Sequence, residues 1–386
     1  LYRPIVFLSQ ALLFTLTSLS ICSITNVIFS DWLGVQLSKV QKLISGFVFS
    51  AALYFFTSQI IEIYTYTSSF FSYYMPVSFL CFALSIIIKE RATAWMYLFL
   101  LLSAFSVGGS AENVSASSLA CLGLFFSVAL LRKKFAIREL FADKRIRKLF
   151  VFIILTSCFA VVAYTAPGAR NRALTEENNL FLKANVLFSP VDFDIFLWKF
   201  SHPTNIMAVM ILGWFTYLGF LIPGDKKKIV RSILGWTFGF FIVAVSVHLL
   251  ITKVIFDSYG YLRIWFPVNF YICVFSASFM LYFGVMIRNK LKRAAPLVFG
   301  GLSLFFVCFY FYRHYLPVSE FSYKYFERRA YVKNHCNSNP ADSLIVPRPG
   351  NPDILYFDKF LRFPQDSLST YFCIFNEIPC KNVEVK

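Results

Sequence analysis

A succession of about ten apolar stretches constrains this chain of 386 residues more than any other feature. A helix needs about 20 mostly apolar residues to cross a membrane. Backbone N–H and C=O groups cannot remain unpaired in lipid, so the stretches are expected to be helices. They lie near residues 5–29, 44–61, 76–88, 93–109, 114–131, 149–165, 203–223, 233–256, 264–287 and 295–316. The predicted fold class is therefore an all-α polytopic membrane protein with about ten transmembrane helices.

Composition excludes an ordinary soluble enzyme. Hydrophobic residues make up 58% of the chain and charged residues only 15%, against about 25% charged residues in soluble domains. The net charge is +17. The cations occur in short runs between apolar stretches, which is typical of membrane loops. We therefore expect membrane lipid as a partner, and no nucleic acid.

Basic residues follow every second apolar stretch. The runs begin at Lys39, Lys89, Arg132, Lys226 and Arg288. The positive-inside rule places these loops in the cytoplasm. Leu1 and the tail from Pro317 then lie on the outer side. Because multi-span proteins usually begin inside, we expect an odd number of helices before Leu1, most simply one.

Two segments depart from the helical pattern. Residues 166–202 mix charged and apolar side chains, which predicts amphipathic pieces in the membrane interface. Residues 317–386 are rich in proline and predict a small extracytoplasmic appendage after a transmembrane domain, 1–316. Two of the tail cysteines can pair in an oxidising compartment. Cys373–Cys380 is one plausible bridge, but Cys336 is left over and the sequence does not choose.

Polar residues accumulate at helix ends on the predicted outer side. Glu62 is followed by Tyr64, Tyr66, Tyr73 and Tyr74. These residues form either a helix-end carboxylate with an aromatic belt or a polar rim around a sugar.

The turn Gly108–Asn113 offers a second pair of interpretations. Ser110 could cap the next helix, with Glu112 and Asn113 in its first turn. Alternatively, Glu112 and Asn113 belong to a binding site, because a carboxylate and an amide at membrane depth are costly otherwise.

Arginines on the predicted outer side oppose the positive-inside bias and suggest an anionic partner. Arg170, Arg172, Arg263 and Arg3 are the candidates, since guanidinium binds phosphate with a planar fork. The simpler interpretations are contacts with lipid headgroups and an aromatic–arginine interface anchor.

Nucleotide and metal chemistry find no support in the motifs. The histidines have no metal-ligand spacing, and His248 is expected mid-helix as a packed polar residue. Walker, dinucleotide-binding and serine-hydrolase patterns are absent from the sequence. No cofactor is expected with certainty; a divalent metal stays open.

Taken in order, the outer motifs resemble an uncharacterised bacterial integral-membrane family grouped with the GT-C glycosyltransferases. The residues that carry the resemblance are Glu62 with Tyr64, Tyr66 and Tyr73, then Gly109-Ser110-Ala111-Glu112, then Ala166-Pro167-Gly168-Ala169 with Arg172, and finally Arg263. The proline-glycine-arginine signature is moderately specific, and the order of the others strengthens it.

Three departures from the family are visible. Ala169 stands where the family has Asn, and the Asn-Glu pair occurs here as Glu112-Asn113. The family's acidic catalytic motif follows its first helix and has no counterpart here. Leu1-Tyr2-Arg3 resembles the stretch after that loop, so we expect the catalytic base upstream of Leu1. Asp31 is predicted on the cytoplasmic side and is a poor substitute.

The resemblance implies an enzyme of the bacterial inner membrane. It would transfer a sugar from a polyprenyl phosphate to a glycan, lipid or protein acceptor on the extracytoplasmic side. Arg170, Arg172, Arg263 and Arg3 would bind the phosphate. The residues that would bind sugar or acceptor are Glu62, Tyr64, Tyr66, Glu112 and Asn113.

Two other classes stay open. A non-catalytic subunit or scaffold of a cell-envelope complex would use the tail and the basic loops to dock other envelope proteins. A flippase for a lipid-linked glycan should carry polar residues through the middle of the bundle, whereas the helix centres here are mostly apolar.

Overall fold

A computed structural model of the chain describes residues 2–55, 70–91, 93–133, 137–166, 208–251, 266–288, 297–309, 343–346 and 382–385. The chain divides into two compact units, Leu1–Val307 and Cys308–Lys386.

The larger unit is helical. Its α-helices are α1 (Tyr2–Val27), α2 (Lys39–Phe55), α5 (Met75–Ile87), α6 (Ala94–Gly108), α7 (Glu112–Arg132), α8 (Ile137–Ala142), α9 (Lys144–Thr165), α14 (Trp214–Leu221), α15 (Lys227–Ile251) and α16 (Phe266–Ile287). The π-helical turns η1 (Ile28–Trp32) and η2 (Phe70–Tyr74) extend α1 and precede α5, and the 3₁₀ turn η3 (Gly224–Lys226) precedes α15. A further apolar helix spans Leu297–Phe309. Each predicted apolar stretch contains at least part of a helix; the short α8 was not predicted.

Five helical segments are long and apolar enough to cross a membrane: Leu8–Trp32, Glu112–Arg132, Lys144–Thr165, Gly224–Ile251 and Phe266–Ile287. The shorter apolar helices are Phe71–Ile87, Ala94–Gly108, Ala208–Leu221 and Leu297–Phe309. Large apolar side chains point outward from them; Trp95 is 70% exposed and Val162 is 66% exposed. An apolar exterior of this kind suits lipid rather than water, so the chain is a helical membrane protein.

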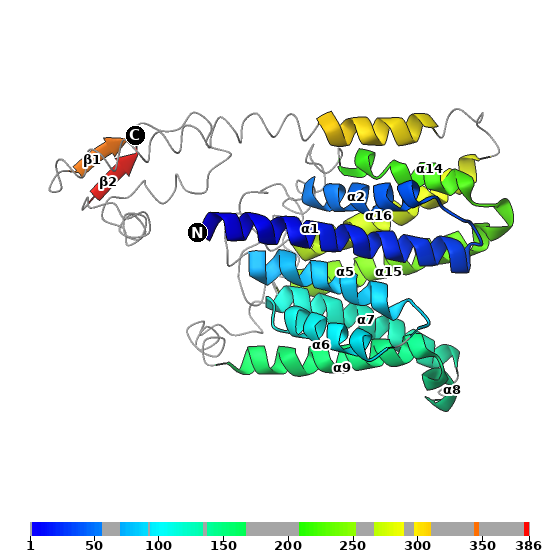
Figure 1. Cartoon of the computed structure of the whole chain (residues 1–386). Helices are drawn as coiled ribbons and strands as arrows, with labels where there is room; N and C mark the ends of the chain where they lie inside the picture. Colours follow the sequence, from blue (N-terminus) through cyan, green and yellow to red (C-terminus); the bar gives the residue numbers. More distant parts are fainter. Residues whose placement is uncertain are drawn as a thin grey trace. The chain divides into compact units, whose positions relative to one another are not determined.

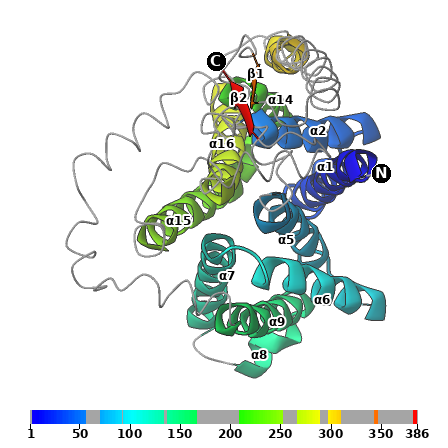
Figure 2. The ribbon, with the colours of Figure 1, turned by 90° about the vertical axis from the view of Figure 1, so that its left-hand side faces the viewer.

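The helices contact one another in a closed series that is visible along the bundle in Figure 2. α1 packs on α2 and α5, and α5 continues through α6, α9 and α7 to α15. α16 packs on both α15 and α14 and also contacts α2. The first half of α16 is buried on all sides, as expected of a helix that is apolar all round.

Contacts between helix termini define two ends of this unit (Figure 1). Lys148, near the start of α9, contacts the end of α5, and Arg132, at the end of α7, lies over Trp236 in the first half of α15. We call this the basic end. Tyr164, near the end of α9, contacts the start of α7, so the start of α7 lies at the opposite end.

Close helix crossings depend on glycine. A Cβ added to Gly46 of α2 would lie 2.1 Å from the backbone oxygen of Ser18 in α1. A Cβ on Gly284 of α16 would lie 2.2 Å from the Thr216 backbone oxygen and 2.9 Å from the Gly219 Cα of α14. Small residues at such crossings let membrane helices approach closely, where dispersion replaces the hydrophobic effect as the main attraction.

Buried hydroxyl groups add hydrogen bonds between helices. Thr17 Oγ1 donates to Ser78 Oγ over 3.0 Å and so joins α1 to α5. Trp214 Nε1 donates to Ser45 Oγ over 3.0 Å and so joins α14 to α2. Such bonds contribute about 0.6 kcal/mol each on average in membrane proteins.

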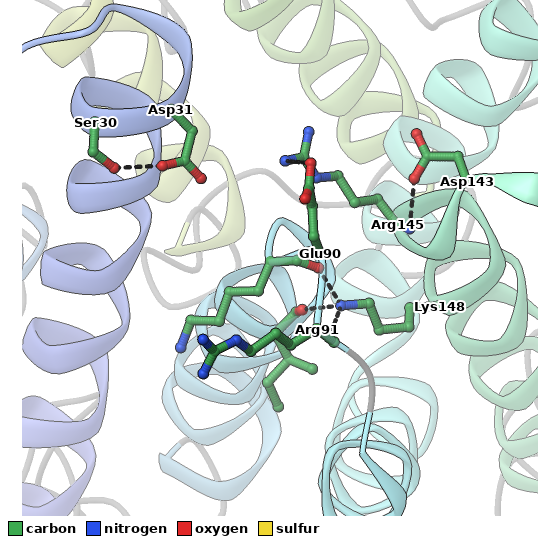
Figure 3. A network of polar contacts seen from close by, with 9 residues as sticks. Ser30, Asp31, Glu90, Arg91, Asp143, Arg145 and Lys148 are labelled. Atoms are coloured by element: carbon green, nitrogen blue, oxygen red, sulfur yellow. Dashed lines mark hydrogen bonds and ion pairs between the residues drawn. The ribbon is translucent and has the colours of Figure 1, made fainter.

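A buried lysine ties α9 to the turn after α5 (Figure 3). Lys148 is 0% exposed, and its Nζ donates to the backbone oxygens of Ile86, Lys89 and Arg91, the first over 2.7 Å and the last over 3.0 Å. The last carbonyls of a helix have no partner within the helix. The Lys148 ammonium therefore donates to carbonyl oxygens that would otherwise lack a hydrogen-bond donor at the end of α5 and in the turn after it.

An exposed pair lies beside this contact. Arg145 Nη2 is 2.9 Å from Glu90 Oε1, and Asp143 Oδ1 accepts from the Arg145 backbone N–H as the N-cap of α9. Figure 3 shows that Asp31, in η1, lies at the same end, where it accepts from Ser30 Oγ.

The smaller unit contains a parallel pair of strands among its described residues. β1 (Ser343–Val346) pairs with β2 (Asn382–Val385), with Ser343 opposite Asn382. The proposed Cys373–Cys380 bridge lies outside the described residues.

Candidate functional site

The first two turns of α7 are polar although they are buried. Asn113 and Ser115 are 0% exposed, and Ser117 and Ser118 are 1% exposed. Ser117 Oγ donates to the Asn113 backbone oxygen, and Ser115 Oγ donates to that of Glu112 over 3.2 Å. Local bonds of this kind satisfy the hydroxyls but leave the amide of Asn113 to partners on other helices. Polar side chains inside a membrane helix are a functional-site hypothesis by default.

Asn113 meets His248 across the α7–α15 contact. Its Nδ2 lies 3.5 Å from His248 Nδ1, and both side chains are 0% exposed. The bond is at the long limit for N–H···N geometry, and the nitrogen of His248 accepts when it carries no proton. His248 lies in the last described turn of α15 and is fully buried, which agrees with the expectation of a packed polar residue in a helix.

Tyr164 brings a phenol to the same place from the last turn of α9. Its hydroxyl donates to the Glu112 backbone oxygen over 3.2 Å and is hydrogen-bonded to Ser115 Oγ. The side chain is 37% exposed. Three helix ends therefore converge in what we call the α7 polar cluster: Glu112, Asn113, Ser115, Tyr164 and His248.

Ser110 does not cap α7. The N-cap is Ala111, which makes no side-chain cap bond. Ser110 Oγ instead donates to the Val107 backbone oxygen over 2.6 Å. The hydroxyl donates to a carbonyl in the last turn of α6, where carbonyls have no partner within the helix. The capping interpretation fails because the hydroxyl is bound there and not to the start of α7.

The tyrosines of η2 belong to the core. Tyr73 is 6% and Tyr74 is 2% exposed. The Tyr74 ring lies 5.7 Å from that of Phe266, at the start of α16, in an edge-on contact. The backbone N–H of Ala111 donates to the Ser72 oxygen over 3.4 Å. Tyr73 and Tyr74 thus anchor η2 beside α7 and do not form an exposed rim.

Among the predicted binding residues, the structure brings Glu112 and Asn113 into the cluster. Arg3 lies in the first turn of α1, and its side chain is not described. The other predicted residues lie outside the described part of the chain: Glu62, Tyr64, Tyr66, Arg170, Arg172 and Arg263. Asp31 lies at the basic end, and its location on the cytoplasmic side stays a prediction.

Sequence reasoning did not select Tyr164, Ser115 or His248 for the site. Tyr164 had a signal, because it lies two residues before the Ala166-Pro167 signature in the sequence. His248 is 135 residues from Asn113, and only the packing of α7 on α15 makes the pair evident.

The cluster offers hydrogen-bonding groups of every kind: a carboxylate, an amide, a phenol, a hydroxyl and an imidazole. Within the described residues no group of three or more His, Cys, Asp or Glu side chains is placed to hold a metal ion. The cluster therefore contains both hydrogen-bond donors and acceptors.

Replacing Tyr164 by Phe tests the cohesion of the cluster. The change removes the hydroxyl that Ser115 and the Glu112 carbonyl share, and we expect a loss of about 1 kcal/mol. The measurement is the midpoint of thermal unfolding in detergent micelles. Tyr97→Phe in α6 is the matched control, because the structure gives the Tyr97 hydroxyl no hydrogen bond with a described residue. Equal shifts for both variants would contradict the bridging role.

Comparison with protein-family models, curated proteins and solved structures gave no match.

Proposed function

We propose that this chain is a GT-C-type membrane glycosyltransferase with about ten transmembrane helices. It transfers a sugar from a polyprenyl-phosphate donor to an acceptor on the extracytoplasmic side of the bacterial inner membrane. The observation that carries the proposal is the α7 polar cluster at the end of the helical unit opposite the basic end. The positive-inside rule assigns the basic end to the cytoplasm, so the cluster and the tail would face outward.

The groups of the cluster suit a polyhydroxylated ligand. Amide and phenol groups both donate to and accept from sugar hydroxyls, and a carboxylate accepts from them. Burial makes each such group costly to leave unpaired, so a site built from them rejects a ligand that lacks the matching hydroxyl. Glu112 and Asn113 would line the sugar or acceptor pocket together with Glu62, Tyr64 and Tyr66.

Chain connectivity limits how far the candidate phosphate ligands can lie from the ends of α9 and α16. Arg170 follows Tyr164 by six residues, and six residues reach at most about 20 Å. Arg172 is two residues further along, and Arg263 lies three residues before the start of α16. Arginines at this end would hold the leaving phosphate through bidentate bonds.

The reaction follows from these roles. A carboxylate removes the proton of the acceptor hydroxyl, and the acceptor oxygen attacks the anomeric carbon. The polyprenyl phosphate leaves with the bonding electron pair, so the transfer inverts the anomeric centre. The donor is already activated, and nucleotide-binding motifs are not required.

The experiment uses membranes that contain the full chain and a panel of polyprenyl phosphates carrying radiolabelled glucose, mannose or other hexoses. Transfer is read as the label that leaves the polyprenyl-phosphate carrier, whether it moves to a glycan, a lipid or a protein. Removing one charged hydrogen-bond donor costs about 1.5–3 kcal/mol, so we expect Arg172→Ala to lower the rate at least about tenfold.

Arg147→Ala, at the basic end, is the matched control for Arg172→Ala and should keep the rate. Transfer by Arg172→Ala at the wild-type rate would remove the phosphate role. Label that stays on every carrier in wild-type membranes would favour the alternative, a non-catalytic subunit of an envelope complex.

A further inference from the structure

The basic end holds more cations than its described carboxylates neutralise. Glu90 pairs with Arg145 at 2.9 Å, and Asp225 pairs with Lys226 at 3.8 Å. Asp143 is used as the N-cap of α9, and Asp31 accepts from Ser30 Oγ. Other cations of this end are exposed and form no ion pair with a described carboxylate: Arg132, Lys133, Lys144, Arg147, Lys227, Lys228 and Arg231. We call these residues the basic surface.

Helix polarity makes this excess unfavourable within the protein itself. α9 and α15 both begin at the basic end, and neither has an acidic residue in its first turn. The N-terminus of a helix carries partial positive charge, so lysines and arginines there add like charge to like charge. At the start of α9, Asp143 and the carbonyl oxygens bound by Lys148 offset part of this positive charge. Lys144 and Arg147 remain exposed.

The members of the basic surface come from adjacent helices. α7 packs on both α9 and α15, and Figure 2 shows α7 between them. Arg132, at the end of α7, lies with its guanidinium 5.4 Å from the centre of the Trp236 ring of α15. This cation–π contact holds the guanidinium over a ring. The cations of three helices thus form one surface.

The surface lies directly at the border of apolar helical segments. α7, α9 and the segment that contains α15 are each long and apolar enough to cross a membrane. In the sequence, Arg147 and Lys148 are followed at once by Leu149, and Lys228 by Ile229. Lipid phosphates occupy this depth, where the polar and hydrocarbon regions meet.

We propose that the basic surface binds the headgroups of anionic phospholipids. Charge complementarity identifies the occupant: an excess of guanidinium and ammonium groups, with a tryptophan beside them, matches a phosphate headgroup whose net charge is negative. The proposal does not depend on the function proposed for the α7 polar cluster.

The test uses the full chain in vesicles and its own tryptophan fluorescence. Brominated phosphatidylglycerol and brominated phosphatidylcholine quench nearby tryptophans, and the ratio of quenching gives the relative affinity of the two lipids. The contribution of Trp236 is the difference between each protein and its Trp236→Phe counterpart. For the wild type we expect several-fold preference for phosphatidylglycerol, reduced at high salt.

Two variants locate the effect. The first neutralises the surface with Lys144→Gln, Arg147→Gln, Lys227→Gln, Lys228→Gln and Arg231→Gln, and keeps Arg132 beside Trp236. Removing these five cations removes most of the attraction to an anionic headgroup, so we expect the preference to fall to near equality. The second variant, Lys39→Gln with Lys42→Gln, alters basic residues in the first turn of α2 and should keep the preference.

Three results would overturn the proposal. The first is equal quenching by both lipids in the wild type, and the second is an unchanged preference in the first variant. The third is a loss of preference in the α2 variant as large as that in the first variant, because the preference would then depend only on the net charge of the protein. If the variant with five substitutions does not fold, two double variants replace it. They are Lys144→Gln with Arg147→Gln, and Lys227→Gln with Lys228→Gln. Each should lose part of the preference for phosphatidylglycerol.

Discussion

Replacing Gly284 by alanine is expected to lower the free energy of unfolding by about 3 kcal/mol. The added Cβ would lie 2.2 Å from the backbone oxygen of Thr216 and 2.9 Å from the Cα of Gly219. Both neighbours are backbone atoms of α14, so no side chain can turn away to make room. The helices would have to separate, and α16 would lose dispersion contacts along the crossing.

The measurement is the midpoint of thermal unfolding in detergent micelles. Gly239→Ala in α15 is the matched control, because a Cβ there meets nothing within 4 Å. In that open position alanine should stabilise the helix by up to about 1 kcal/mol. Similar midpoints for the two variants would contradict the close crossing of α14 and α16.

Replacing Lys148 by methionine is expected to lower the free energy of unfolding by about 3 kcal/mol, because three carbonyl oxygens lose a charged donor together. One belongs to Ile86 in α5, and the others belong to Lys89 and Arg91 in the turn after it. Methionine keeps the length of the lysine stem and its apolar contacts. Replacing a buried ion by an apolar residue is harmless only where its partners are replaced as well, and here the carbonyls of Ile86, Lys89 and Arg91 remain.

Lys144→Met provides the comparison for Lys148→Met. Lys144 lies one turn earlier in α9, and its side chain is exposed, so its replacement should change the midpoint of thermal unfolding little. Equal midpoints of thermal unfolding for Lys148→Met and Lys144→Met would refute the stabilising contact between Lys148 and the end of α5.

The sequence located the helices of this protein well, because each apolar stretch is a local signal. The run Lys144–Lys148 shows the limit of such a signal. From the sequence, all cations of this run are expected to lie in one exposed loop. In the structure α9 begins at Lys144, and Lys148 lies one turn further along the helix. Only the position of α5 distinguishes the buried lysine from its exposed neighbours.

The α7 polar cluster was predictable in part for the same reason. Glu112 and Asn113 follow a glycine turn that interrupts an apolar pattern, and this interruption is visible in the sequence. The role of Ser110 was mistaken, because its hydroxyl could serve either of two adjacent helix ends and the sequence does not say which. Contacts with Tyr164 and His248 require helices that are distant in the chain to lie side by side.

The bond from Lys148 to Ile86 joins residues 62 positions apart, and this separation has a consequence for biosynthesis. When the ribosome has delivered α5 and α6 to the membrane, the donor for the last carbonyls of α5 has not yet been made. α6 and α7 must both be synthesised before α9 can supply it. The hydrogen bonds that join α9 to the end of α5 can therefore form only late in synthesis, after α6, α7 and the start of α9 have been made.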